Sequence, residues 1–87
     1  MASMFIQHKI RDYAAWRPAY DAHERARVAV GITNGRVYRK ANDWNDLVIL
    51  FEVADPTKAR AWAVGKDLET TMQKAGVLGT PVIHFIG

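Results

Sequence analysis

The three histidines of this 87-residue chain are its best candidates for acid–base chemistry. His23 follows Tyr20 by three positions and precedes Arg27 by four, so a helix would direct these side chains to one side. An imidazole titrates near neutral pH and can accept a proton from a substrate. A phenol hydroxyl can donate a hydrogen bond to the same substrate. We therefore predict a catalytic set with His23 as base and Tyr20 or Tyr38 as donor. The alternative is a structural His23, half-buried and hydrogen-bonded to a carboxylate or carbonyl group.

Four side chains are predicted to bind a ligand: His8, Trp16, Arg27 and His84. His8 and His84 lie in the first and last predicted strands, which are antiparallel neighbours in the predicted fold, so the rings would meet if the register puts them on one face. Tyrosine and tryptophan each carry a polar atom that needs a partner when buried. If several such atoms converge, they would suit an aromatic ligand that bears oxygen. The alternative is that these aromatic residues, which recur at helical spacing, form part of the hydrophobic core.

The composition excludes several kinds of site. The chain has no cysteine, and its one serine, Ser3, lies in no nucleophile motif. Serine or cysteine nucleophiles, disulfides and thiolate-bound metals are therefore excluded. The histidines lack a metal-ligand spacing, and the glycines match no phosphate-binding or dinucleotide-binding loop. We predict neither a metal nor a cofactor.

The distribution of charge bears on the partners. Residues 1–40 hold eight basic and three acidic side chains, and residues 41–87 hold four basic and six acidic. A basic half can attract nucleic acid, but here acidic residues alternate with the basic ones and no nucleic-acid-reading motif is present. No apolar run approaches the roughly 20 residues that span a bilayer, and the first residues match no signal peptide. We predict a cytoplasmic protein without membrane contact, and we do not expect nucleic acid as its partner.

The apolar pattern predicts the order strand, helix, strand, strand, helix, strand. Strands are expected at Phe5–Arg11, Arg36–Lys40, Leu47–Val53 and Val82–Ile86, the last after a turn at Gly79–Pro81. Asp12 and Asp55-Pro56 are typical helix starts, and Gly31 is a typical helix end. Pro18 is expected to kink the first helix or to begin it anew. Trp62 shares a helix face with small alanines, which predicts a structural anchor rather than a cavity residue.

Two strand–helix–strand units in tandem predict an α+β, ferredoxin-like βαββαβ fold, with a four-stranded antiparallel sheet and the helices on one face. The strand Leu47–Val53 is apolar at almost every position, so both of its faces need cover. The helices can cover only one face, and a second copy related by a twofold axis would cover the other. We therefore predict a homodimer through the sheet face. The single domain is expected to cover residues 4–87, with residues 1–3 treated as a cloning remnant.

Three stretches resemble a known family. They are Asp12–Glu24, with Asp12-Tyr13, Trp16-Arg17-Pro18, Asp21 and His23-Glu24; Val37–Asp43, with Val37-Tyr38-Arg39 and Asn42-Asp43; and Met72–Gly79. Through them the chain resembles small stand-alone proteins of the dimeric α/β-barrel superfamily, which includes antibiotic biosynthesis monooxygenases and polyketide cyclases. The resemblance implies a dimer whose sheets pack together and a small-molecule cavity between sheet and helices. The oxidising members of this superfamily act on aromatic substrates without metal or flavin. The resemblance also gives His8 a place comparable to that of a strand histidine in the cyclase-like members.

These observations predict a dimeric α/β-barrel protein that binds a small apolar or aromatic molecule. If it is an enzyme, the expected chemistry is cofactor-independent oxygenation or proton transfer of the cyclase type. The first alternative is a non-catalytic ligand-binding or stress-associated dimer with the same cavity, which a dry, filled core would favour. The second alternative is a basic nucleic-acid accessory protein. Convergent polar atoms in a cavity would favour the enzyme.

Overall fold

The computed structural model describes residues 2–87, and its elements follow the predicted order, with each predicted helix divided in two. The strands are β1 (Ala2–Ile10), β2 (Ile32–Lys40), β3 (Asp43–Val53) and β4 (Val77–Ile86). The helices are α1 (Tyr13–Ala22), α2 (Glu24–Ala29), α3 (Pro56–Ala63) and α4 (Lys66–Lys74). None of these helices is long and apolar enough to cross a membrane.

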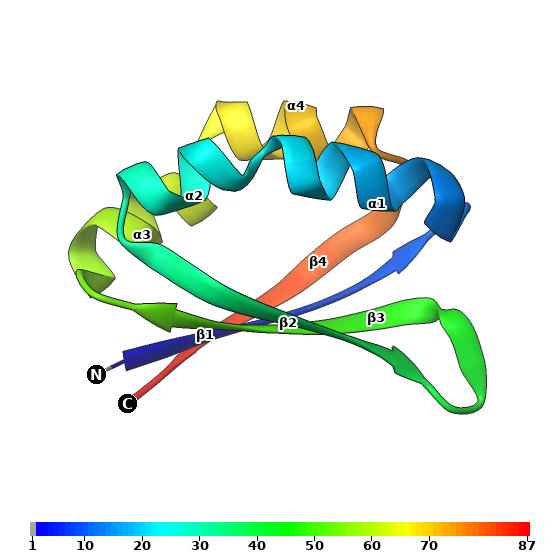
Figure 1. Ribbon diagram of the computed structural model, residues 1–87, viewed down its shortest axis with the longest axis horizontal. Helices are drawn as coiled ribbons and strands as arrows, with labels where there is room; N and C mark the ends of the chain where they lie inside the picture. The colour runs from blue at the N-terminus through cyan, green and yellow to red at the C-terminus, as the bar shows by residue number, and fades with distance from the viewer. Residues whose placement is uncertain (1) are drawn as a thin grey trace.

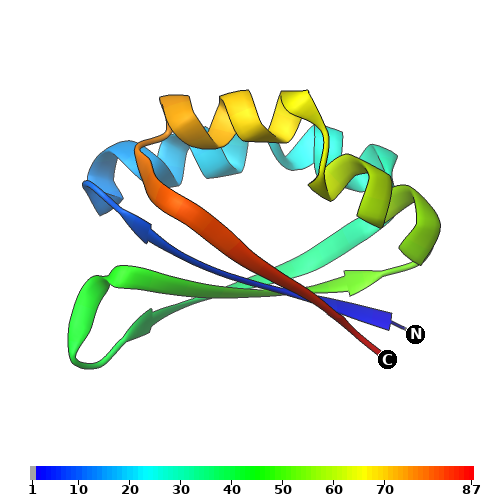
Figure 2. The same ribbon diagram turned by 180° about the vertical axis from the view of Figure 1, so that it is seen from behind.

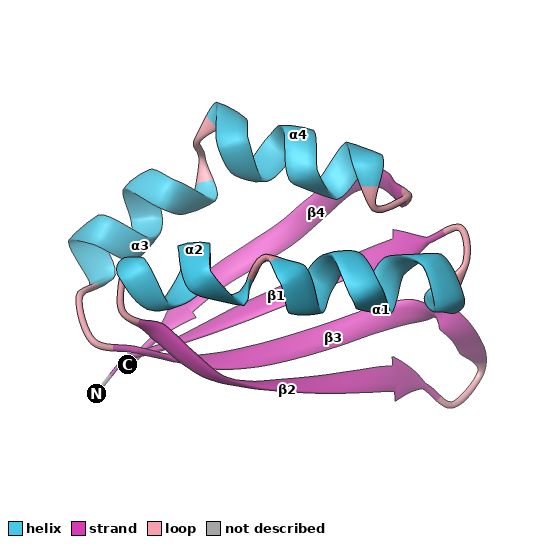
Figure 3. Ribbon diagram, turned by 45° about the horizontal axis from the view of Figure 1, so that its top comes forward, coloured by secondary structure: helices cyan, strands magenta, loops and turns pink. Residues whose placement is uncertain are grey.

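The strands form one antiparallel sheet in the order β2-β3-β1-β4. All the helices lie over one face of this sheet, and the other face is bare in both side views (Figure 1, Figure 2). Seen from the helix side, the α1–α2 pair and the α3–α4 pair run next to each other across the strands (Figure 3). The ferredoxin-like α+β fold is confirmed.

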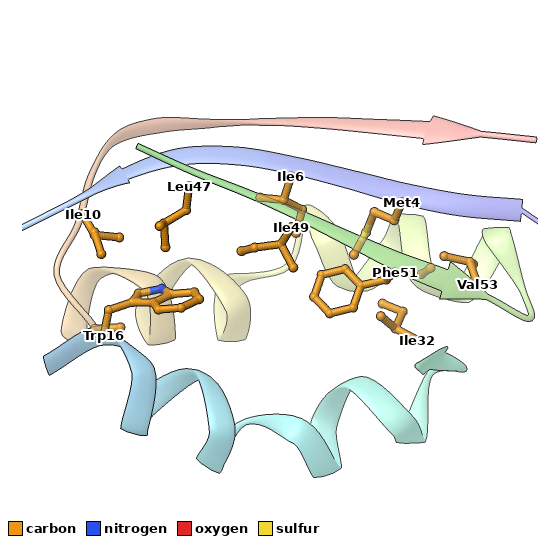
Figure 4. Close-up of a cluster of buried hydrophobic side chains, with 11 residues drawn as sticks. Met4, Ile6, Ile10, Trp16, Ile32, Leu47, Ile49, Phe51 and Val53 are labelled. Atoms are coloured by element: carbon orange, nitrogen blue, oxygen red, sulfur yellow. The ribbon is translucent and has the colours of Figure 1, made fainter. Parts of the chain in front are cut away.

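The core lies between the sheet and the helices, and the period of the strands decides which residues enter it. In β1 the buried apolar residues are Met4, Ile6 and Ile10, and in β3 they are Leu47, Ile49, Phe51 and Val53. These side chains point toward the helices, where the Trp16 indole of α1 meets them (Figure 4). Because every second residue is buried, the intervening residues of both strands must lie on the bare face.

The predicted helix ends are confirmed. Asp12 accepts the Ala14 N–H at 3.2 Å, and Asp55 accepts the N–H groups of Thr57 and Lys58 at 3.1 and 3.3 Å. These bonds satisfy amides that the first turn of a helix leaves without a partner. Gly31 follows α2 with a φ of 78°, a conformation that glycine adopts without strain.

Pro18 does not begin a new helix, which was one of its two predicted roles. Pro18 lies inside α1, and the helix is interrupted at His23 instead, where φ is −88° and ψ is 5°. The Arg27 guanidinium donates to the Tyr20 carbonyl oxygen at 2.8 Å, an oxygen that would accept the Glu24 N–H in a continuous helix. The Tyr20 carbonyl also accepts the His23 N–H at 3.2 Å, so the Arg27 side chain and a tighter turn together satisfy this oxygen at the interruption.

All four strands begin earlier than predicted. β1 starts at Ala2, which is paired with Val53, so Ala2 and Ser3 are part of the sheet; Met1 lies outside the described residues. β2 starts at Ile32, β3 starts at Asp43, and β4 starts at Val77. The segment Gly79–Pro81 is not a turn but lies within β4, where the pairing with β1 shifts register. Such a bulge lets an edge strand continue past a glycine and a proline.

Candidate functional site

A cavity of about 50 Å³ lies in the core, between the inner face of the sheet and the two helix pairs. Its wall is mostly apolar, with contributions from β1, β3 and all four helices or their junctions. Polar atoms reach it from His8, Tyr20, His23, Arg27 and Trp62. The cavity therefore gathers its few polar groups from segments that are far apart in the sequence.

His8 projects from the inner face of β1, and its side chain is only 6% exposed. Its ring meets the edge of the Trp16 indole, with 5.9 Å between ring centroids. The Nδ1 atom of His8 is buried and has no hydrogen-bond partner within residues 2–87. Burial lowers the pKa of His8, while its own backbone and the Asp46 carboxylate oppose the shift more weakly. His8 is thus a neutral imidazole at pH 7 with one nitrogen left without a protein partner.

Tyr20 forms the middle of an aromatic row along the wall. Its ring stacks on Trp16 with centroids 4.8 Å apart and is tilted against Phe51 at 6.3 Å. A Cβ atom at position 35 would overlap both the Tyr20 hydroxyl and the Phe51 ring, so only the glycine at this position lets β2 approach so closely. Burial raises the pKa of Tyr20, which keeps the phenol protonated and able to donate.

Arg27 is a charged group in this largely apolar surrounding, and it is only 7% exposed. Its guanidinium carbon lies 4.0 Å from the Tyr20 ring centroid and 5.7 Å from that of Phe51. Among the described residues its one hydrogen bond goes to the Tyr20 carbonyl, and no carboxylate lies within ion-pair distance. Burial lowers the pKa of Arg27 from its very high usual value, and the side chain remains a cation.

His23 closes the cavity where the two helix pairs meet. Its ring stacks on Trp62 of α3 with centroids 5.6 Å apart, and its Nε2 atom lies 3.6 Å from an Asp67 carboxylate oxygen of α4. Because His23 sits at the junction of α1 and α2, its contacts connect all four helices. The ring therefore lines the cavity and also contacts the solvent-exposed Asp67.

Trp62 was predicted to lie outside the cavity, and this was wrong, because its indole lines the wall. Its Nε1 atom is buried without a hydrogen-bond partner in the described part of the chain. The small neighbours of Trp62 predicted close packing; Trp62 does pack against the core, and its ring also stacks on His23. The sequence signal that could have identified it is its N–H group, which requires a partner when buried.

Tyr38 and His84 do not line the cavity, which corrects their predicted placement. Tyr38 is paired with Val48 and His84 with Phe5, and these positions lie on the bare face of the sheet. His8 faces the helices, so the rings of His8 and His84 lie on opposite sides of the sheet and do not meet. The residues that the structure does bring together are His8, Trp16, Tyr20, His23 and Arg27.

The site shows no arrangement typical of a metal centre. In residues 2–87 there is no group of three histidine, aspartate or glutamate side chains placed to hold an ion. The polar side chains that line the cavity carry two imidazoles, a phenol, an indole N–H, a guanidinium and the Thr71 hydroxyl. Such groups bind and orient organic molecules and move protons.

Solved structures with the same architecture identify the fold further. No protein-family model and no curated protein sequence matches the chain. The chain has the fold of the antibiotic biosynthesis monooxygenases. A crystal structure of an antibiotic biosynthesis monooxygenase matches 100% of this chain and 97% of its own, with a TM-score of 0.70 and 14% sequence identity.

Two further structures support this assignment of the fold. SnoaB, a cofactor-independent oxygenase from Streptomyces nogalater, matches 99% of this chain and 90% of its own, with a TM-score of 0.74 and 10% identity. Rv0793 from Mycobacterium tuberculosis matches 99% of this chain and 92% of its own, with a TM-score of 0.68 and 12% identity. The fold that the sequence resemblance implied is therefore confirmed.

Proposed function

We propose that the chain binds a small apolar or aromatic compound in this cavity and acts on it as a cofactor-independent oxygenase or cyclase-like enzyme. The observation that carries the proposal is His8, whose side chain lines the cavity and whose Nδ1 atom is buried without a partner in residues 2–87. Leaving such an atom without a hydrogen bond costs about 1–3 kcal/mol of stability. A filled structural core would not retain this cost, whereas a ligand with a polar group would remove it.

The chemistry that fits these groups begins with removal of a proton. A neutral His8 can accept a proton from an acidic O–H or C–H of the substrate, and the buried Tyr20 phenol and Trp62 indole can donate hydrogen bonds. An electron-rich phenol that has lost its proton can reduce dioxygen directly. One oxygen atom then enters the ring to give a quinone, the other leaves in water with the two hydrogens lost by the substrate, and the substrate supplies all the electrons. The fold neighbour SnoaB, named a cofactor-independent oxygenase, supports this class of reaction.

The size of the cavity sets a condition on binding. About 50 Å³ holds one to a few water-sized groups, whereas a cavity of about 150 Å³ is needed for benzene. An aromatic substrate must therefore widen the cavity. We expect the widening at the seam between the two helix pairs, where His23 stacks on Trp62. The same small volume favours the alternative function, a non-catalytic ligand-binding or stress-associated protein.

The proposed active form is a homodimer through the bare face of the sheet. Several large side chains on this face are exposed to solvent: Tyr38, Leu78, Val82 and Ile86, at 45–55% each. Phe5, Val48 and Leu50 lie between them and are half-buried. A second copy related by a twofold axis presents the same apolar patch, and an obligate interface would bury on the order of 2,000 Å².

A test of the function uses 1-naphthol as an electron-rich phenol and measures dioxygen consumption and product formation by protein treated with a chelator. We expect turnover by the parent and loss of turnover in His8→Leu, with His84→Leu as the matched change on the opposite face. Binding is followed separately by quenching of tryptophan fluorescence, because Trp16 and Trp62 line the cavity. Binding without dioxygen consumption would favour the non-catalytic alternative.

A further inference from the structure

Arg27 has an arrangement that a purely apolar ligand does not explain. A buried cation without a counter-charge is costly, and arginines in protein interiors are usually paired with a carboxylate. In residues 2–87 no carboxylate lies within ion-pair distance of Arg27. The Tyr20 carbonyl satisfies one of its five N–H donors.

The guanidinium is held in place by its surroundings. The Tyr20 ring lies 4.0 Å below its central carbon, and the bond to the Tyr20 carbonyl, at 2.8 Å, ties it to the end of α1. A guanidinium fixed in this way has already lost much of its conformational freedom, so binding a planar anion costs less entropy. Among the residues that line the cavity, Arg27 is the one with a permanent charge.

We propose that the Arg27 end of the cavity is an anion subsite, and that the compound bound there is an aromatic molecule carrying a carboxylate. The inference rests on the proposed function, since it names the chemical class of ligand for the same cavity. A carboxylate is planar and accepts two parallel N–H bonds from a guanidinium. Its size suits the present cavity of about 50 Å³, whereas the attached ring is the part that needs the widened seam.

His8, at the end of the aromatic row opposite Arg27, would contact the other end of the bound ligand. Trp16 and Tyr20 stack on each other between His8 and Arg27, so His8 lies at one end of this aromatic row and Arg27 at the other. A ligand that lies along the row would place its carboxylate on Arg27 and its reacting end near the His8 Nδ1 atom. Both residues are more than nine-tenths buried. Binding energy gained at Arg27 would then position the ligand for chemistry at His8.

The test compares benzoate with benzamide, a neutral molecule of the same shape, by isothermal titration at constant ionic strength. We expect benzoate to bind the parent protein about tenfold or more tightly than benzamide, as for a charge-assisted bidentate contact. Arg27→Met should remove this preference by weakening benzoate alone. Arg25→Met is the matched control, because Arg25 is an exposed arginine of the same helix, and it should leave both affinities unchanged.

The outcomes separate this inference from the proposed function. Equal binding of the two probes to the parent protein would overturn the anion subsite and leave the proposed cavity function standing. An equal loss of benzoate binding in Arg25→Met and Arg27→Met would also overturn it, since the preference would then come from surface charge. Failure of both probes to bind would contradict the subsite and the proposed function together. Should Arg27→Met fail to fold, Arg27→Lys is the second variant, because it keeps the positive charge but lacks the two parallel N–H donors of the guanidinium. We expect the Arg27→Lys protein to keep a reduced preference for benzoate.

Discussion

Replacing His8 by leucine should make the protein more stable while removing its proposed function. Leucine is close to histidine in volume and has no polar atom, so it would fill the same place against Trp16. The buried Nδ1 atom lacks a partner in residues 2–87, and a missing hydrogen bond of this kind costs about 1–3 kcal/mol. We therefore expect the free energy of unfolding at pH 7.5 to rise by roughly that amount.

The pH dependence of the free energy of unfolding provides a second test of the burial of His8. Burial lowers the pKa of His8 in the folded state below the usual 6.5. Between these two pKa values the unfolded chain binds a proton that the folded chain does not, so the free energy of unfolding falls as the pH is lowered from 6.5 toward the folded pKa. The contribution of one such group is at most about 1.4 kcal/mol per pH unit, and it is absent above the unfolded pKa.

The assay is urea denaturation at a series of pH values between 7.5 and roughly 5, at one protein concentration, because dimerisation would make stability concentration-dependent. In His8→Leu the free energy of unfolding should no longer show the contribution of His8 to its slope with pH. His84→Leu is the control, because it makes the same change at an exposed position on the opposite face, and it should retain this contribution. A His8→Leu variant that is less stable than the parent at pH 7.5, or that keeps the full slope, would refute the reasoning. The first result would mean that the His8 side chain makes a stabilising interaction that leucine cannot replace, and the second would mean that the pH dependence comes from other groups.

The remaining predictions concern the cavity wall, metals and assembly. His23→Ala should change the free energy of unfolding by less than about 1 kcal/mol and weaken 1-naphthol binding, because the ring closes the cavity rather than filling the core; unfolding of this variant would make His23 structural. Trp62→Ala should cost about 3 kcal/mol, and a melting temperature within a degree or two of the parent would contradict its packing role. Treatment with a chelator should leave the melting temperature unchanged, and a large drop would reveal a metal site. Light scattering should give the mass of a dimer at micromolar concentration, and a monomer would exclude the sheet-face interface.

Much of the fold could be predicted because its signals are local. The caps at Asp12 and Asp55 act within three residues, and the alternation in β1 and β3 follows from the two-residue period of a strand. The order of strands and helices then leaves few ways to pair them. Where a local signal was overridden, the cause was pairing with a distant strand: the bulge in the β1–β4 pairing keeps Gly79 and Pro81 within β4 instead of forming the predicted turn.

For the candidate site, the sequence by itself determined which residue types were present and that His23, Tyr20 and Arg27 share one side of a helical segment. It did not determine which face of the sheet each strand residue occupies, because that depends on register between strands distant in the chain. The pairing of His84 with Phe5 put His84 on the bare face, and the pairing of Tyr38 with Val48 did the same for Tyr38. Only the tertiary structure showed that Arg27 is buried beside the cavity with no carboxylate of residues 2–87 within ion-pair distance, because this depends on every element packed around it.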